Sequence, residues 1–230
     1  MVPPFCVGGF MKIGDIKIEA LKLMFSSYDW DYSAEQMEEL EASEQFRDHL
    51  INMPGAINRC FAAIENKGVL PCKQHIVQYI TKIIDGVSVI ILKGGTETDY
   101  GIEIKMSEEV TDFLDVDRVS YRGKFGDYHP TFPFMREGDT ILLEGIYPGD
   151  TYTVMYRPRI SRGYSDSTEL SELGVPDRIA AFIPYFIKGD LFREEDAAEA
   201  SNARAWFEAA MDELVGQRAS YGGVQTVFGM

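Results

Sequence analysis

The chain has 230 residues, 45% of them hydrophobic and 12% aromatic, which is enough to bury the core of one ordinary globular unit or two small ones. The longest apolar stretch, residues 179–187, is interrupted by Pro184 and is far shorter than the roughly 20 residues that cross a bilayer, so we expect no membrane-spanning helix. The formal charge of -15, from 37 acidic and 22 basic residues, argues against a general nucleic-acid-binding protein, because such binding depends on phosphate neutralisation by Lys and Arg.

The first ten residues are set apart from the rest of the chain. They contain no Lys or Arg before their apolar residues, and their apolar core is too short for a signal peptide, so we expect no secretion. Residues 11–20 read like the beginning of a protein. Residues 1–10 are therefore interpreted either as an upstream start or as a mobile arm.

Residues 11–84 are predicted to form an N-terminal helical part. Apolar residues recur at helical spacing from Ile13 to Phe25, which predicts a first helix. An acidic stretch at residues 26–44 predicts a loop and then a short helix, with a capping box at residues 33–36. The helical period returns at Phe46 and ends at Gly68, and we expect Pro54 to break or restart this helix.

Residues 85–160 change to short β-branched and aromatic runs separated by Gly, Asp and Pro. The expected strands are residues 88–92, 101–105, 116–121, 140–143 and 151–156. The Gly94-Gly95 pair is interpreted as a hairpin turn, because no Gly-Lys-Ser/Thr sequence follows it as in a phosphate-binding loop. We expect the strands to form one small antiparallel sheet or a sandwich.

Residues 161–218 return to helical spacing and are predicted to complete the helical part. A helix is expected around residues 179–187, and a final Ala-rich helix carries Trp206 and Met211. The acidic residues 194–196 are interpreted as charges at the N-terminus of this last helix, and residues 219–230 as a mobile tail. The predicted fold class is α+β, a helical bundle with a small antiparallel β-sheet or sandwich inserted between its N-terminal and C-terminal helices.

The cysteines indicate a reducing compartment, because Cys6, Cys60 and Cys72 are odd in number and form no CxxC pair. Cys60 and Cys72 with His75 would supply three soft metal ligands, but their spacing and the missing fourth ligand favour a buried Cys and a surface or capping His. Asp115 and Asp117 share one face of a predicted strand and are interpreted as solvated carboxylates. We expect no metal and no cofactor.

No residue set points to catalysis. The three histidines, His49, His75 and His129, accompany no Gly-x-Ser-x-Gly turn, so we expect no enzyme, and a small hydrolase would depend on one of these histidines. Aromatic residues at strand or helix spacing are expected mainly in the core, although they would also suit stacking on a sugar or a base. These residues are Tyr147, Tyr152, Tyr156 and Trp206.

The second half of the chain contains several short sequence motifs that are distinctive in this order. The first motif is Met106-Ser-Glu-Glu-Val, and the next two are Gly138-Asp-Thr-Ile-Leu-Leu143 and Gly149-Asp-Thr-Tyr. The most distinctive motif is a predicted apolar helix that ends in Gly189-Asp-Leu-Phe-Arg-Glu-Glu-Asp196 and is followed by the Ala-rich helix. With these motifs and the order of its elements, the chain resembles the head-to-tail connector, or adaptor, proteins in the neck of tailed bacteriophages. Counting element order, the resemblance covers residues 11–214.

The resemblance implies a structural virion protein without an active site, assembled in the cytoplasm of the bacterial host. Its subunits form a ring, commonly twelve-fold, under the portal protein, and the ring extends the DNA channel and gives the next neck or tail protein a platform. Each heterologous contact then closes by rotation. An acidic wall would suit the passage of DNA without sequence-specific binding, because it repels phosphate.

The expected contacts with neighbours involve the N-terminal arm, the tail and the long segment 122–136, which we expect to protrude. The candidate interface residues are Phe5, Phe10, Tyr128, Phe132, Phe134, Tyr221 and Phe228. The alternative is a non-catalytic ligand- or carbohydrate-binding β module on a helical base, which would bind through exposed aromatic residues such as Tyr147 or Tyr152.

Overall fold

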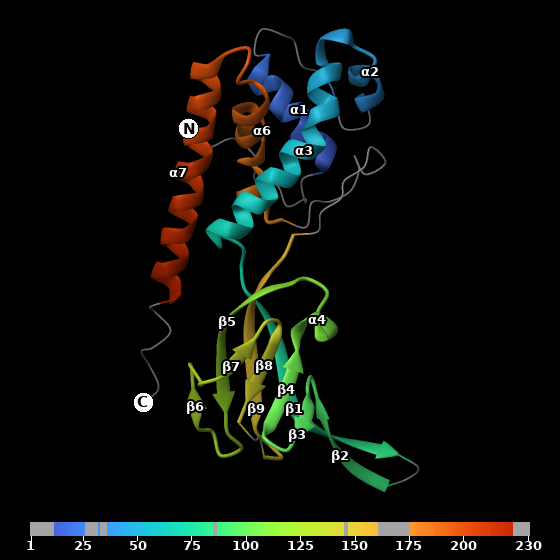
Figure 1. The fold of residues 1–230 in the computed structure, drawn as a ribbon, viewed down its shortest axis with the longest axis vertical. Coiled ribbons are helices and arrows are strands. Elements are labelled where there is room, and N and C mark those ends of the chain that lie inside the picture. Colours follow the sequence, from blue (N-terminus) through green and yellow to red (C-terminus); the bar gives the residue numbers. More distant parts are fainter. Residues whose placement is uncertain are drawn as a thin grey trace. The chain divides into compact units, whose positions relative to one another are not determined.

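A computed structural model describes residues 12–25, 32, 36–84, 87–144, 147–160 and 175–222. The chain divides into two compact units: a helical unit from Met1–Leu70 and Ile160–Met230, and a β unit from Pro71–Arg159 (Figure 1). The fold is therefore α+β, with small antiparallel sheets inserted between helices, as predicted.

The helical unit is centred on α6 (Ile183–Leu191), which packs against three other helices. Its core contains Leu21, Phe61 and Phe207, all fully buried. The other helices are α1 (Ile13–Met24), α2 (Met37–Glu41), α3 (Glu44–Lys67), α5 (Asp177–Ala180) and α7 (Ala197–Gly222). The predicted capping box at residues 33–36 falls mostly outside the described residues.

Pro54 does not break its helix, and that prediction was wrong. It lies inside α3, which runs without interruption to a left-handed Gly68 at φ 67°. A proline removes one backbone hydrogen bond and usually disrupts a helix interior. Here Leu50, Met53 and Ile57 form one buried face on both sides of the proline, so packing against the core outweighs this cost.

The last two helices cross closely, and the second of them, α7, begins at an acidic cap as predicted. Asp196 Oδ1 accepts hydrogen bonds from the backbone N–H groups of Ala198 (3.0 Å) and Glu199 (2.9 Å), which confirms the expected charge at this helix N-terminus. A Cβ atom on Gly189 would lie 3.1 Å from Ala200 O and 3.1 Å from the Arg204 Cβ, so glycine permits the close approach of α6 and α7. Helix α7 extends to Gly222, so the part of the expected tail before residue 223 is helical.

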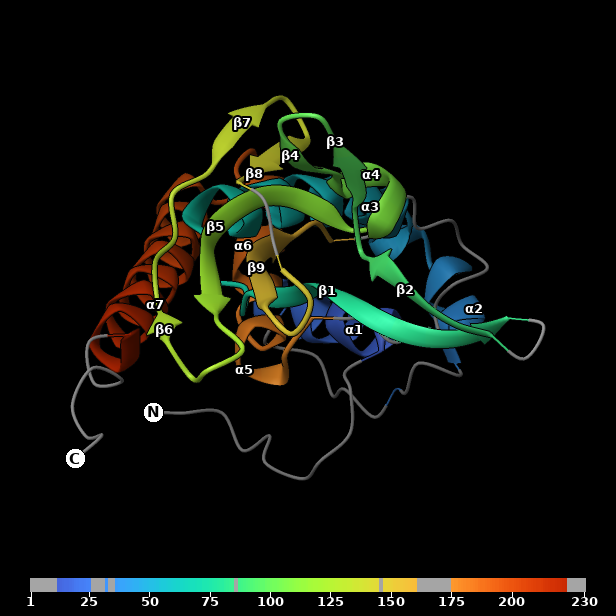
Figure 2. The ribbon, with the colours of Figure 1, turned by 90° about the horizontal axis from the view of Figure 1, so that it is seen from below.

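The β unit contains two antiparallel sheets (Figures 1 and 2). The five-stranded sheet has the order β2-β1-β9-β5-β6, and the four-stranded sheet has the order β3-β4-β8-β7. Strand bounds are β1 (Lys73–Ile84), β2 (Val87–Lys93), β3 (Thr96–Thr98), β4 (Gly101–Lys105), β5 (Phe113–Arg122), β6 (Tyr128–His129), β7 (Met135–Glu137), β8 (Thr140–Leu143) and β9 (Thr151–Pro158), with the short helix α4 (Met106–Glu109) after β4. The two sheets share a core that includes Val77, Ile104, Val119, Ile141 and Val154.

The boundary between the first two parts lies earlier than predicted. The β unit begins at Pro71, and β1 occupies residues that were assigned to the helical part. Strand β1 pairs with β9, which lies about 75 residues further along the chain, and this long-range pairing decides the structure of a segment with ambiguous local periodicity. The Gly94-Gly95 pair connects β2 to β3, which belong to different sheets, so it is not a hairpin turn within one sheet.

Candidate functional site

The first feature of the candidate site is a two-stranded extension of the five-stranded sheet. Strand β1 pairs with β9 only from Lys73 to Gln78, whereas its pairing with β2 continues to Ile84. Residues 79–84 and 87–92 therefore form a two-stranded segment, here called the ribbon, with β2 as the edge strand. In Figure 2 the ribbon extends away from the other strands of both sheets. An isolated two-stranded ribbon is marginally stable in water.

The ribbon carries apolar side chains on both faces. Strand alternation places Ile83 and Ile90 on the same face as the core residue Val77, and there they are 76% and 56% exposed. This face is covered by the four-stranded sheet at Val77 but not at the ribbon. The other face carries Ile80 and Ile91, which are half-buried, and Val89, which is exposed. Contiguous exposed apolar side chains of this kind are typical of interaction sites.

The charge of the ribbon differs from that of the whole chain. Residues 73–93 carry Lys73, Lys82 and Lys93 against a single acidic residue, Asp85, in a protein of net charge -15. At the base of the ribbon, burial and a hydrogen bond with Glu97 of β3 raise the pKa of Tyr79. Lys73 and Lys93 lie outside the ribbon, and Lys73 pairs with Asp112, so Lys82 is the one charged residue among 79–84 and 87–92. The ribbon is thus an apolar surface of low charge on an acidic protein.

The second feature is a pocket of about 220 Å³ at one end of the four-stranded sheet. It lies where β3 and β8 end and β4 and β7 begin, and its lining includes Tyr100, Phe134, Met135, Leu142 and Glu144. Tyr100 and Met135 are highly exposed at this site. The volume is smaller than the roughly 300–1,000 Å³ of pockets that hold drug-sized ligands, and it suits one or two aliphatic side chains.

The surroundings of the pocket are acidic. Residues 96–105 and 133–144 carry two basic residues, Lys105 and Arg136. The same residues include six carboxylates: Glu97, Asp99, Glu103, Glu137, Asp139 and Glu144. This part of the β unit is therefore negatively charged, whereas the ribbon carries little charge.

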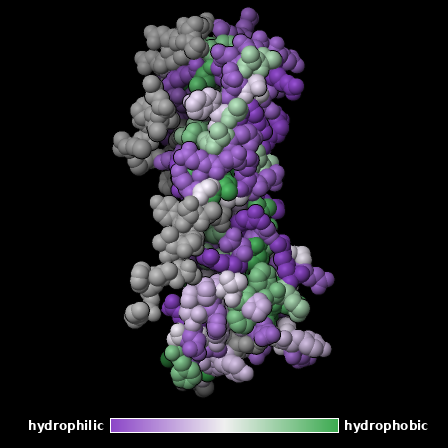
Figure 3. Space-filling model, turned by 90° about the vertical axis from the view of Figure 1, so that its left-hand side faces the viewer, coloured by the Kyte–Doolittle hydropathy of each residue, from purple (hydrophilic) through white to green (hydrophobic). Residues whose placement is uncertain are grey.

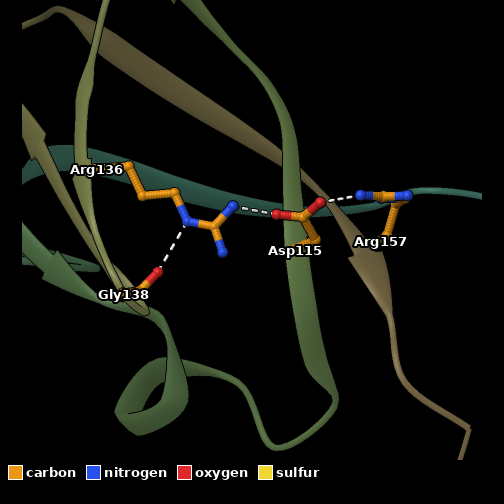
Figure 4. A network of polar contacts seen from close by, with 4 residues as sticks. All are labelled: Asp115, Arg136, Gly138 and Arg157. Atoms are coloured by element: carbon orange, nitrogen blue, oxygen red, sulfur yellow. Dashed lines mark hydrogen bonds and ion pairs between the residues drawn. The ribbon is translucent and has the colours of Figure 1, made fainter.

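A polar network fixes one wall of the pocket (Figure 4). Asp115 of β5 pairs with Arg157 of β9 and with Arg136 of β7, and Arg136 Nε also donates a hydrogen bond to Gly138 O at 2.8 Å. The network joins the two sheets and holds β7, whose Met135 lines the pocket. Asp115 was predicted to be solvated, but irregular pairing of β5 with β9 on both sides of it interrupts the strand alternation on which that prediction relied.

A second carboxylate ties the start of β1 to the end of β9. Asp112 accepts hydrogen bonds from Lys73 Nζ (2.5 Å) and from the Tyr156 hydroxyl (3.0 Å). Burial disfavours the ionised carboxylate, but these two hydrogen bonds outweigh it and lower the pKa of Asp112. Burial and the same hydrogen bond raise the pKa of Tyr156 to about 12.

Of the predicted interface residues, three lie outside the described part of the chain and a fourth has a side chain that is not described. Phe5, Phe10 and Phe228 lie outside the described residues, and Tyr221 lies on α7 with a side chain that is not described. The predicted arm at residues 1–10 also lies outside the described part of the chain.

The other three lie in or near the segment 122–136 and differ in exposure. Tyr128 is exposed, and Phe134 lines the pocket. Phe132 packs against the core, with ring centroids 5.3 Å from Tyr121 and 5.0 Å from Tyr152, and its N–H bonds to Val119 O at 2.7 Å. Together with β6 this anchors the segment to the five-stranded sheet, so it does not protrude as a free loop.

The aromatic residues considered for ligand stacking divide into two groups. Tyr152 and Tyr156 are buried, as predicted for core residues, and the Tyr152 hydroxyl donates to Glu144 O at 3.3 Å. Tyr147 and Trp206 are exposed, so the core prediction was wrong for them. Trp206 is exposed because it is adjacent to Phe207, which occupies the inward position on α7.

Two of the histidines contact polar groups, and one of the cysteines is buried. His75 Nε2 lies 2.8 Å from Gly94 O, and His49 Nε2 lies 3.0 Å from a Glu195 carboxylate oxygen. Cys60 is fully buried, and burial raises the pKa of its thiol. Within the described ranges, no three His, Cys, Asp or Glu side chains lie close enough together to hold a metal ion.

Comparison with known protein sequences identifies no relative of this chain. No protein-family model matches the chain, and no curated protein matches it significantly. None of the helices in the described part of the chain is both long and apolar enough to cross a bilayer.

The exposed ribbon is the feature that sequence reasoning missed. A strand was expected at residues 88–92, but neither its pairing with residues 79–84 nor the exposure of the ribbon was expected. The available signal was the sequence of residues 79–92, in which apolar residues occupy both faces of the predicted strands. Such a pattern is typical of a strand that is buried on both faces. In the structure β2 is instead an edge strand.

Proposed function

We propose that this chain is a structural protein of the tailed-bacteriophage neck that forms a ring under the portal, joins the head to the tail and continues the DNA channel. The observation that supports it most directly is the ribbon, because the exposed Ile83 and Ile90 on an extension of low charge are typical of a surface that a partner covers. In this role the partners are further copies of the chain, the portal protein and the next neck or tail protein, within the virion.

Residues of the motif 189–196, on which the resemblance depends, have structural roles that suit a non-catalytic structural protein. Gly189 permits the crossing of α6 and α7, Asp190 pairs with Arg59 at 2.5 Å, and Asp196 caps α7. These residues build a rigid helical unit. Figure 3 shows that the described surface of this unit is mostly hydrophilic on the face drawn, whereas hydrophobic residues gather in patches over the β unit. Contacts between subunits are therefore expected mainly through the β unit.

The test measures the mass of the purified chain alone and after mixing with the portal protein from the same phage genome, by native mass spectrometry and negative-stain imaging. We expect a ring of this chain to add to the portal. The portal of an unrelated phage serves as the control and should not recruit the chain. A chain that stays monomeric and does not bind the portal protein of its own phage would contradict the proposal and favour the alternative of a ligand-binding β module.

A further inference from the structure

We propose that the pocket at the end of the four-stranded sheet binds an arginine side chain from a basic, extended segment of a partner protein. The proposal goes beyond the ring and does not depend on it, because the binding can be measured on the chain alone. It rests on an apolar pocket that has a carboxylate in its lining and further carboxylates on the adjoining face of the sheet.

The apolar walls of the pocket suit the stem of a long side chain. Phe134, Met135 and Leu142 contribute to its lining, and its volume is about 220 Å³. An arginine side chain buries its methylene groups against apolar surface of this kind and keeps its charged head at the edge. Tyr100 is exposed and Phe134 half-buried, so both leave ring surface accessible to a planar guanidinium.

Glu144 supplies the carboxylate for the cationic head. It lies in the lining of the pocket, and it is exposed. The two basic residues of the surrounding segments are already engaged by carboxylates outside the pocket. Lys105 pairs with Glu108 at 2.6 Å, and Arg136 pairs with Asp115. The Glu144 carboxylate is therefore open to a cation from outside, and a guanidinium can donate two parallel hydrogen bonds to it.

The face of the sheet beside the pocket favours a protein segment over a small amine. Glu103, Leu142 and Met135 lie in one row across β4, β8 and β7. Strand alternation places Glu137 on this face and the core residue Ile141 on the opposite one. The face thus continues the combination of apolar side chains and carboxylates beyond the pocket. A segment with further basic residues meets complementary charge along it, whereas the phosphates of a nucleic acid are repelled.

The pocket is formed before any partner binds. The ion pair of Arg136 with Asp115 holds the edge strand β7 against the other sheet. Gly101, in the lining, has φ 140°, and a Cβ atom there would lie 2.1 Å from Leu143 O, so glycine permits the close approach of β4 and β8. Little ordering is therefore needed when a side chain enters.

The test measures the affinity of the full-length chain for fluorescently labelled, capped peptides by anisotropy. The first peptide has a central arginine, a leucine on either side and a lysine at each end. In the second, citrulline, a neutral isostere, replaces the arginine. Unlabelled capped arginine alone competes as a third probe. The Met135 methyl signal in NMR spectra, assigned by its loss in Met135→Lys, reports where the arginine peptide binds.

Two variants alter the site, and each has a matched control. Glu144→Gln removes one negative charge from the pocket, and Glu194→Gln makes the same change at an exposed residue of the helical unit. Met135→Lys adds a cation at the pocket, and Phe125→Lys adds one at an exposed apolar residue outside it. All four positions are exposed, so each variant should fold, which circular dichroism checks.

We expect the arginine peptide to shift the Met135 methyl signal and to bind about tenfold more tightly than the citrulline peptide, which is the lower end for a hydrogen bond to a charged group. Glu144→Gln should weaken binding by about the same factor and Met135→Lys by more, while the two controls stay close to wild type.

Equal losses in Glu144→Gln and Glu194→Gln would show unspecific attraction to an acidic chain and overturn the inference. Capped arginine that binds as tightly as the peptide would show a small cationic ligand instead of a protein segment. Self-association of the wild-type chain that Met135→Lys abolishes would make a second copy the occupant, which also overturns it. Because these measurements need no portal, their failure is distinct from failure of the proposed ring.

Discussion

Two adjacent aromatic residues of α7 provide a sharp test of the packing described for the helical unit. Phe207 is 0% exposed and its ring lies 5.0 Å from that of Phe186 in an edge-on contact, whereas Trp206 is 65% exposed. Removing a buried phenylalanine leaves a cavity that costs about 3–5 kcal/mol in the free energy of unfolding. Removing an exposed side chain usually changes it by less than about 0.5 kcal/mol.

We therefore expect Phe207→Ala to destabilise the helical unit by about 3–5 kcal/mol and Trp206→Ala to change it little, although tryptophan is the larger residue. With a urea m-value of roughly 2 kcal/mol/M, the first variant should unfold at a urea concentration lower by about 1.5–2.5 M. Urea unfolding followed by circular dichroism at 222 nm measures this shift, because α7 and its partners dominate the helical signal. Equal shifts for the two variants would refute the placement of α7 with Phe207 inward.

Three further predictions concern the β unit. The pKa of Asp112 lies below its ordinary value of 3.8, so the folded state binds fewer protons than the unfolded state near that pH. The stabilisation by the Asp112 carboxylate should therefore be present above about pH 4 and be lost as the pH falls through the lowered pKa. Asp112→Asn should flatten this pH dependence of the free energy of unfolding, measured by urea titration at several pH values. Asp115→Asn should destabilise the β unit by about 1–3 kcal/mol in urea unfolding, because two arginines lose their shared carboxylate, and an unchanged midpoint would contradict the network in Figure 4. Gly94→Ala should lower the melting temperature much more than Gly126→Ala. Both glycines have positive φ, but only at Gly94 would a Cβ atom lie 2.4 Å from a backbone oxygen. Similar losses for the two variants would show that the backbone strain at positive φ, and not the close contact, sets the size of the loss.

The helices and most of the strands were predictable because their patterns are local. The helical period of residues 13–25 and the alternation of residues 151–156 each identify an element without knowledge of its partners. The strand bounds of β4 and β8 agree with the predicted ones, since each short apolar run ends at turn residues. Local pattern also predicted the acidic cap of α7.

Features that depend on distant partners were not predictable in the same way. Pro54 lies in an intact helix because the core holds both halves of α3 in line, and β1 is a strand because β9 pairs with it. The pocket requires the ends of β3 and β8 to meet the beginnings of β4 and β7, and no local pattern encodes that. Phe134 was named as an interface candidate from its sequence context alone, and it lines this pocket.

The order in which the units appear on the chain has a consequence for synthesis on the ribosome. The Lys188 ammonium donates a hydrogen bond to Leu23 O at 2.7 Å, across 165 residues of sequence. At roughly 5–20 residues per second, α1 therefore waits about 8–33 s for the helix that covers it. All strands of the β unit emerge within that interval, so the β unit is expected to fold first, while the apolar faces of α1 and α3 are exposed to chaperones and to each other.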